Sequence, residues 1–227
     1  MIRKMRTHNK LSQSTTTPEM ALEILKEGND RFVSNLRINR NLLGMVNDTK
    51  EGQWPVAAIV SCMDSRTSAE LIFDQGLGDI FSIRLAGAVV SDNVLGSLEY
   101  ACKVAGSKFI VVLGHTHCGA IKGACDHVEM GNLTGLLGKI RPAVFQEKTI
   151  TENRNSKNHE FVEAVTNIHT DRSVQAILEQ SIILAEMIDN GEVGIIGAMY
   201  DVETGVVTFH EHTKRIGKPL QVVEKTA

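Results

Sequence analysis

The chain has 227 residues, of which 42% are hydrophobic and 22% charged, and its formal net charge is −3 at pH 7. These values are ordinary for a soluble globular protein that buries its own core. They exclude a broad electrostatic attraction to nucleic acid or to an acidic membrane surface, and an aromatic content of 4% argues against a base-stacking surface. The longest apolar run is too short for a membrane-spanning helix. From the charge, the aromatic content and this run length together, we expect neither a nucleic acid nor a membrane as a partner.

The amino-terminal stretch MIRKMRTHNKLSQSTTTP is basic but has no apolar run, so it is not a secretory signal. The alternative is an organellar transit peptide, but the amphipathic arginine face typical of one is missing, and a polar or domain-capping terminus is favoured. We therefore expect a cytoplasmic protein. In that compartment, scattered cysteines are more typical of metal binding or free thiols than of disulfides. The chain has four: Cys62, Cys102, Cys118 and Cys125.

A helix is predicted to begin after Thr17, an N-cap residue that precedes Pro18 and Glu19. Apolar residues then recur at helical spacing as far as Phe32. A charged and amide-rich stretch over 36–54 separates this helical arm from the rest of the chain.

Four short apolar runs predict buried strands. They cover 56–62, 80–86, 109–115 and 193–200. The runs are rich in β-branched residues and nearly continuous, as expected for parallel strands covered on both faces. Helical patterns over 91–106 and 172–191 lie between them, and each ends at a glycine. This alternation predicts a parallel α/β sheet.

The run GVVTFHEH over 205–212 follows the turn sequence DVETG, which predicts a hairpin and an antiparallel edge strand. The polar stretch over 147–160 predicts an exposed loop or a frayed helix junction. The expected fold class is α/β, with a mainly parallel central sheet (four parallel strands plus an antiparallel edge strand), flanking helices and an N-terminal helical arm.

We expect a single domain over 1–227. Its helical arm covers 1–50, the α/β core covers 51–212 and a C-terminal tail covers 213–227.

Three metal-binding residue types fall at the ends of predicted strands. Cys62 ends the first strand, His115 ends the third, and Cys118 follows on the next turn. Parallel strands present ligands at their carboxyl ends, and neighbouring strands lie roughly 5 Å apart, so these side chains can surround one ion. Two thiolates and an imidazole suit zinc, and three protein ligands leave the open position of a catalytic site.

Plainer interpretations of the same residues remain open. A cysteine at a strand end is often only a small buried hydrophobe. His117 competes with His115, because strand alternation places both on one face. Asp64 and Arg66 can form a surface ion pair that adds little stability, or a pair that orients a reacting oxygen beside a metal.

The two motifs CMDSR at 62–66 and HTHC at 115–118, in this order, resemble the β-class carbonic anhydrases. The family pattern is Cys-x-Asp-x-Arg followed by His-x-x-Cys, and the resemblance covers nearly the whole chain. It implies one zinc ion per chain with three ligands: Cys62, His115 and Cys118. It thereby selects His115 over His117.

The resemblance also implies the activity, which is reversible hydration of CO2 to bicarbonate and a proton. In the family, zinc-bound hydroxide attacks CO2 and is oriented by an Asp–Arg dyad, here Asp64 and Arg66. Three further positions match substrate-binding residues of the plant-like branch: Gln53, Phe81 and Tyr100. A fourth expected substrate-binding residue, Gly119, follows the last ligand and would let substrate approach the metal closely. For the two aromatic residues the simpler alternative is core packing, and for Gln53 it is a solvent-facing loop amide.

One departure lies after the second strand, where RLAG replaces the Arg-Asn-Ala-Gly common in the family. Leu85 removes an amide, which puts substrate fit in doubt more than zinc binding. Two other functions stay open. One is hydrolysis of COS or CS2 on the same zinc site, and the other is a non-catalytic zinc-binding module. In the family the N-terminal arm wraps a neighbouring subunit, so we expect a homodimer, with pairing into a tetramer as the alternative.

Overall fold

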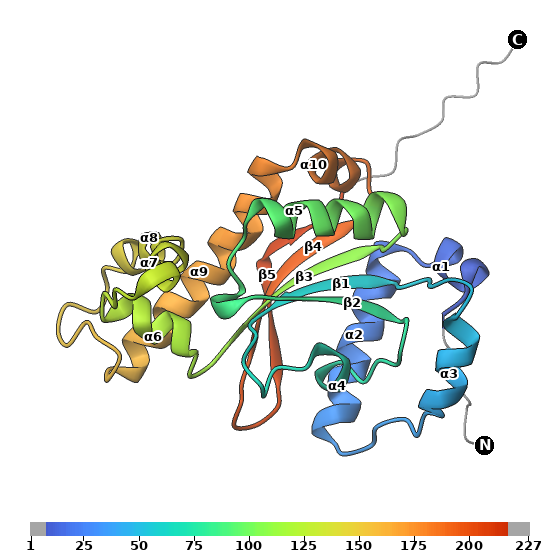
Figure 1. Ribbon diagram of the computed structural model, residues 1–227, viewed down its shortest axis with the longest axis horizontal. Coiled ribbons are helices and arrows are strands. Elements are labelled where there is room, and N and C mark those ends of the chain that lie inside the picture. The colour runs from blue at the N-terminus through green and yellow to red at the C-terminus, as the bar shows by residue number, and fades with distance from the viewer. Residues whose placement is uncertain (1–7, 218–227) are drawn as a thin grey trace, which may run out of the picture.

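The computed structural model describes residues 8–217, which form one five-stranded sheet with helices on both faces (Figure 1). In spatial order the strands are β2 (Ile80–Arg84), β1 (Ala57–Ser61), β3 (Phe109–His115), β4 (Gly194–Tyr200) and β5 (Val207–Arg215). The first four are parallel, and β5 runs antiparallel to β4 at one edge. The predicted fold class is confirmed.

Figure 1 shows the helices in two layers. On one face of the sheet lie α2 (Pro18–Val33) and α4 (Ala69–Ile72). On the other lie α5 (Asp92–Glu99), α9 (His159–Gln180) and α10 (Ile182–Asp189). Three short helices gather at one end of the molecule, namely α6 (Gly119–Cys125), α7 (Gly131–Gly138) and α8 (Arg141–Gln146).

The remaining elements are short. The arm begins with α1 (Lys10–Thr15) and continues after α2 with α3 (Leu42–Thr49). A single 3-10 turn, η1 (Ala86–Ala88), follows β2, and a π-helical turn, η2 (Tyr100–Val104), ends α5. None of the helices within residues 8–217 combines the length and apolar character needed to cross a membrane.

Burial on both faces explains why the three inner strands β1, β3 and β4 lack an apolar–polar alternation. Ile59 and Val111 pack in the cluster that includes α2 and α4, whereas Val60 and Val112 pack in the cluster that includes α5, α9 and α10. Successive side chains of a strand point to opposite faces, so both faces need apolar residues.

The predicted helix over 172–191 is two helices. The chain becomes extended at Ser181, whose hydroxyl accepts a hydrogen bond from the Leu184 N–H at 3.2 Å and donates one to Glu99 Oε1 at 2.6 Å. An N-cap of this kind starts a new helix, although the apolar stripe continues through it. Because the apolar stripe is continuous, the boundary between the two helices at Ser181 was not predicted.

The prediction of an exposed stretch over 147–160 is wrong at Glu147, which is 2% exposed. Arg154 donates a hydrogen bond to its Oε2 at 2.6 Å, and the Thr149 N–H donates one to Oε1 at 2.7 Å. These bonds compensate the buried charge. At the other end of the chain, β5 continues to Arg215 and so includes the first residues of the predicted tail; the tail beyond 217 lies outside the described residues.

Candidate metal centre

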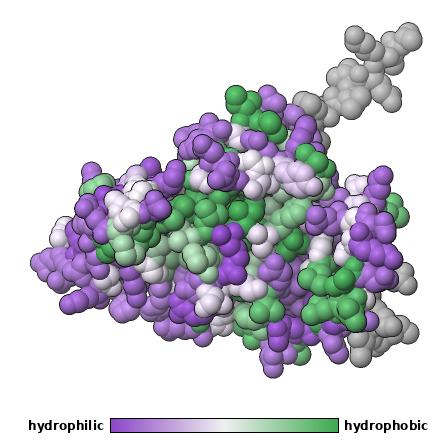
Figure 2. Space-filling model, viewed as in Figure 1, coloured by the Kyte–Doolittle hydropathy of each residue, from purple (hydrophilic) through white to green (hydrophobic). Residues whose placement is uncertain are grey.

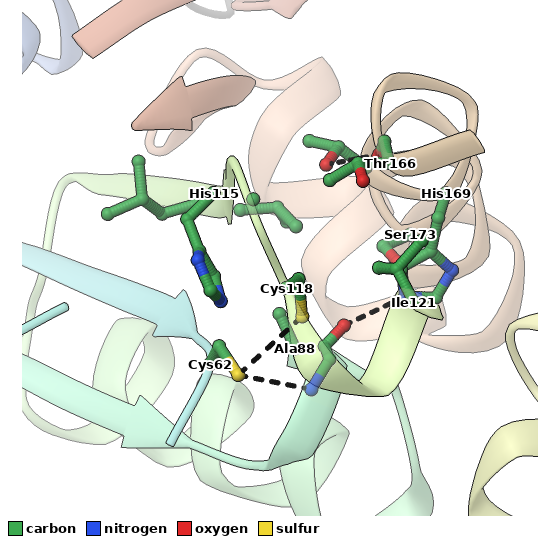
Figure 3. Close-up of a pocket in the computed structure, with 13 residues that line it drawn as sticks. Cys62, Ala88, His115, Cys118, Ile121, Thr166, His169 and Ser173 are labelled. Atoms are coloured by element: carbon green, nitrogen blue, oxygen red, sulfur yellow. Dashed lines mark hydrogen bonds between the residues drawn. The ribbon is translucent and has the colours of Figure 1, made fainter. Parts of the chain in front are cut away.

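The carboxyl ends of β1 and β3 bring Cys62, His115 and Cys118 together. The two strands are hydrogen-bonded neighbours, with Ser61 opposite Leu113, so the chain leaves both strands at the same edge. One possible ligand atom from each of the three residues lies within 4.8 Å of the others. All three side chains are buried, and they converge from two strand ends and the turn before α6 (Figure 3).

The hydrogen bonding of His115 favours a metal ligand. Its Nδ1 lies 2.8 Å from the carbonyl oxygen of Thr116, so Nδ1 carries the proton and donates it to that carbonyl. Its Nε2 is buried and has no hydrogen-bond partner within the described chain. Figure 3 shows this edge of the ring turned toward the two sulfurs. An unpartnered buried nitrogen is costly, and a metal ion would give its lone pair a partner.

The sulfur positions fit the same ion. Cys62 Sγ and Cys118 Sγ are 4.0 Å apart. Tetrahedral zinc with Zn–S bonds of about 2.3 Å separates two sulfurs by roughly 3.8 Å. Little movement is therefore needed to accommodate zinc between these thiols and the free nitrogen of His115.

His117, the competing histidine, points elsewhere. Its backbone has φ 59°, and its Nε2 lies 3.0 Å from Glu203 Oε1. Strand alternation does not extend to His117, because β3 ends at His115 and the chain turns there. Periodicity left the choice between the two histidines open. The turn after His115 directs His117 away from the thiols and so favours His115.

The two thiols share one negative charge. The hydrogen bond with Cys118 lowers the pKa of Cys62 to about 4, against the opposing effect of burial. The neighbouring His115 ring and hydrogen bonds from the N–H groups of Asp64 and Gly87 lower it further. The same sulfur–sulfur bond, followed by burial, raises the pKa of Cys118. A cation between them would favour thiolates at both positions, because metal binding releases thiol protons.

Asp64 and Arg66 form a two-point ion pair beside the thiols. Arg66 Nε lies 2.9 Å from Asp64 Oδ1, and Nη2 lies 2.8 Å from Oδ2. These bonds hold the pKa of Asp64 well below its ordinary value, against the effect of burial. Asp64 therefore remains a carboxylate at neutral pH, in a fixed orientation.

Two residues that the sequence motifs do not single out support the centre. Arg84, at the end of β2, donates from Nε to the Cys62 carbonyl at 3.1 Å and from Nη2 to the Asp64 carbonyl. His169 on α9 bonds through Nε2 to the Gly87 carbonyl at 2.9 Å. The Gly87 N–H in turn donates to Cys62 Sγ at 3.3 Å. Arg84 follows a predicted strand, which was a usable indication, whereas nothing near His169 in the sequence points to the site.

Three of the four residues matched to a substrate pocket do not meet the metal centre within one chain. Gln53 is exposed and precedes the amino end of β1, whereas Cys62 follows its carboxyl end. Phe81 and Tyr100 pack edge to face, with ring centroids 6.3 Å apart, and line an open pocket at β2 and α5. None of the three is among the described residues that line the pocket around the thiols.

Gly119 is exposed at the start of α6. A Cβ added there would meet nothing within 4 Å, so the chain by itself gives no packing reason for a glycine.

Comparison with known proteins agrees with this geometry. Residues 57–207 match the family model described as carbonic anhydrase. Carbonic anhydrase 2 of Mycobacterium tuberculosis (strain CDC 1551 / Oshkosh) is 36% identical over 209 residues, which cover 89% of this chain and 98% of that protein. The carbonic anhydrase of Mycolicibacterium smegmatis is 32% identical over 210 residues, with the same coverage of 89% and 98%.

Solved structures share the fold. A tetrameric β-carbonic anhydrase from Sordaria macrospora has a TM-score of 0.67 at 23% identity, covering 74% of this chain and 86% of that one. The Coccomyxa β-carbonic anhydrase, solved with acetazolamide, has a TM-score of 0.65 at 23% identity, covering 72% and 75%. Because its sequence matches the family over most of its length and its fold agrees, this chain belongs to the β-class carbonic anhydrases, a family of enzymes.

Proposed function

We propose that this protein catalyses the reversible hydration of CO2 to bicarbonate and a proton, with one zinc ion per chain held by Cys62, His115 and Cys118. The observation that carries the proposal is the buried Nε2 of His115, which has no hydrogen-bond partner among residues 8–217 and faces two sulfurs 4.0 Å apart. Zinc at such a site acts as a Lewis acid and lowers the pKa of water, which supplies a nucleophile at neutral pH.

The protein's part in the reaction is to position groups around the attacking oxygen. Asp64 accepts a hydrogen bond from that oxygen and so directs its lone pair toward the carbon of CO2. Arg66 holds both carboxylate oxygens and keeps Asp64 ionised. Arg84 fixes the backbone carbonyls of Cys62 and Asp64, so the loop that carries these two residues keeps its shape.

For substrate binding we propose a pocket shared between two chains. Gln53, Phe81, Tyr100 and Gly119 are its proposed residues, and a homodimer is the simplest assembly that supplies them. The separation of Gln53, Phe81 and Tyr100 from the thiols within one chain supports this arrangement. A tetramer, as described for the Sordaria macrospora proteins, is the alternative.

Exposed apolar side chains support an assembly of chains. On α3, Leu42, Leu43 and Val46 are each more than half exposed. Figure 2 shows hydrophobic surface over α3 and over the middle of the same view. A surface of this kind is typical of an interaction site.

A cytoplasmic location and membership of the plant-like branch stay predictions from the sequence.

The test compares Cys118→Ser with Cys102→Ser, which alters a buried thiol outside the metal centre. We expect stopped-flow CO2 hydration at pH 8.5 in the unmodified protein and in Cys102→Ser. In Cys118→Ser we expect loss of hydration and one zinc fewer per chain than in the unmodified protein. Unchanged turnover in Cys118→Ser would refute the proposed centre. Zinc binding without hydration would favour the non-catalytic module, and sulfide release from COS or CS2 that outpaces bicarbonate formation would favour the other alternative.

A further inference from the structure

A second group of metal-binding side chains lies away from the thiols, between α9 and β5. Asp171 on α9 faces His210 and His212 on β5, and one ligand atom from each lies within 4.8 Å of the others. Asp171 Oδ1 is 2.6 Å from His210 Nδ1, and Oδ2 is 2.8 Å from His212 Nε2. One carboxylate thus joins two imidazoles from a different element.

Strand geometry places the two histidines on one face. His210 and His212 are two residues apart in β5, so both side chains point toward α9, and their rings stack with centroids 5.6 Å apart and an interplanar angle of 17°. Glu211 between them points to the other face, where Lys26 of α2 lies 3.2 Å from its Oε1.

We propose that Asp171, His210 and His212 form a second metal site, which binds a divalent transition-metal ion of the zinc class. Two imidazole nitrogens and one carboxylate oxygen are a ligand set that zinc, cobalt and nickel accept, and they leave a coordination position for solvent or an anion. The set holds no sulfur, which distinguishes it chemically from the centre at Cys62. The proposal does not depend on the proposed function.

Accommodating an ion requires a small opening of the cluster. Bonds of about 2.0–2.1 Å to a tetrahedral ion separate neighbouring ligand atoms by roughly 3.3 Å, so the two observed contacts must lengthen by about 0.5–0.7 Å. The side chain of His212 is 68% exposed and that of Asp171 34% exposed, so both can move. His210, which is 9% exposed, is the fixed member.

The surrounding charges leave the site free to bind a cation. The neighbouring Arg172 is directed to Gln146 on α8, with Nη1 2.9 Å from Oε1. Lys214 lies 2.7 Å from Glu211 Oε2. Within residues 8–217, the hydrogen-bonding side chains on the Asp171 carboxylate are the two histidines, and no lysine or arginine occupies it.

An ion there would join the edge strand β5 to α9, the helix that also carries His169 and Thr170 at the wall of the thiol pocket. The site would therefore connect the sheet edge to the support of the first metal centre. A protein that binds metal in this way is stabilised in proportion to occupancy of the site.

The experiment uses the full chain, reduced and stripped with chelator, then dialysed against micromolar Co²⁺. Cobalt bound by cysteine gives thiolate charge-transfer absorption, whereas cobalt bound by nitrogen and oxygen does not, so the two sites are distinguishable. We compare the unmodified protein with His212→Gln, an exposed position, and with His127→Gln, an exposed histidine outside both clusters. Elemental analysis gives the number of ions per chain.

We expect two cobalt ions per chain in the unmodified protein and in His127→Gln, and one in His212→Gln with its thiolate absorption intact. A single ion with thiolate absorption in the unmodified protein would overturn the proposal, because the cluster would then be hydrogen-bonded only. Persistence of the second ion in both His212→Gln and Asp171→Asn would overturn it as well. A single ion without thiolate absorption in the unmodified protein, lost in His212→Gln, would refute the centre at Cys62 and support this one.

Discussion

At the residue scale, the pairing of Arg66 with Asp64 matters for orientation rather than for stability. The Arg66 side chain is 50% exposed, and ion pairs in such positions add little to folding. Its two parallel hydrogen bonds nevertheless fix the plane of the carboxylate, which a single-point contact cannot do.

Replacing Arg66 should therefore impair catalysis without removing the metal. We expect both Arg66→Ala and Arg66→Lys to lower kcat/KM for CO2 hydration by about 10–100-fold, the usual effect of losing a group that orients a metal site. Lysine keeps the charge but cannot form the two-point contact. Stopped-flow kinetics with zinc analysis would measure both effects, and normal kcat/KM in Arg66→Lys would show that charge alone suffices.

The buried imidazole of His169 should make the folded protein less stable against unfolding in acid. Burial lowers its pKa from 6.5 to about 4, against the hydrogen bond with Gly87. Between these values the unfolded chain binds a proton that the folded chain does not, so the free energy of unfolding falls as the pH is lowered from about 6.5 to about 4. The expected loss is on the order of 2–3 kcal/mol.

The variant His169→Gln tests this expectation, because glutamine does not titrate and keeps an N–H donor for the Gly87 carbonyl. Urea unfolding of metal-free, reduced protein across this pH range should give a flatter stability profile for the variant than for the unmodified protein. The metal-free form avoids acid release of zinc as a second cause. Parallel profiles would assign the acid sensitivity to other groups.

At the element scale, the close contact of α2 with the segment after α4 depends on Gly28. A Cβ at this position would lie 1.8 Å from the backbone oxygen of Phe73, which cannot rotate away. Gly135, in α7, is the matched control, since a Cβ there would meet nothing within 4 Å.

We expect Gly28→Ala to lower the free energy of unfolding by about 1–3 kcal/mol, because α2 must move away from Phe73. Gly135→Ala should raise it by about 0.5–1 kcal/mol, because alanine is the better helix former at an exposed position. Urea unfolding measures both. A neutral effect of Gly28→Ala would mean that α2 packs more loosely than the contact indicates.

At the scale of the whole molecule, the proposed shared pocket predicts complementation between two inactive chains. A dimer of one Cys118→Ser chain and one Gln53→Ala chain has a site in which metal ligands and Gln53 are all intact. If that site joins two chains, the isolated heterodimer should show roughly half the hydration activity of the unmodified dimer.

The heterodimer can be isolated with two different affinity tags and compared with both parent proteins by stopped-flow kinetics. Activity no higher than the mean of the parents would place Gln53 in the same site as its own chain's thiols, or in none. A protein that light scattering shows to be a monomer at micromolar concentration would refute the assembly itself.

Much of the fold was predictable because local patterns coincide with the tertiary environment. The four continuous apolar runs became the parallel strands, since burial on both faces removes alternation. The break at Ser181 was missed because an apolar stripe reports burial, whereas a cap depends on one side chain and its local hydrogen bonds. Burial of Glu147 was missed because it depends on how the chain folds back to bring the guanidinium of Arg154 to its carboxylate.

The sequence by itself determined the candidate ligand set: two thiols and an imidazole in family order, with an acid–base pair between them. Only the tertiary structure decided which histidine nitrogen is free, that Arg84 and His169 support the thiols, and that Asp171 meets two histidines some forty residues later. The reason is that residue type and spacing are local properties. The direction of a lone pair and the partner of a buried group are set by which strands and helices pack together.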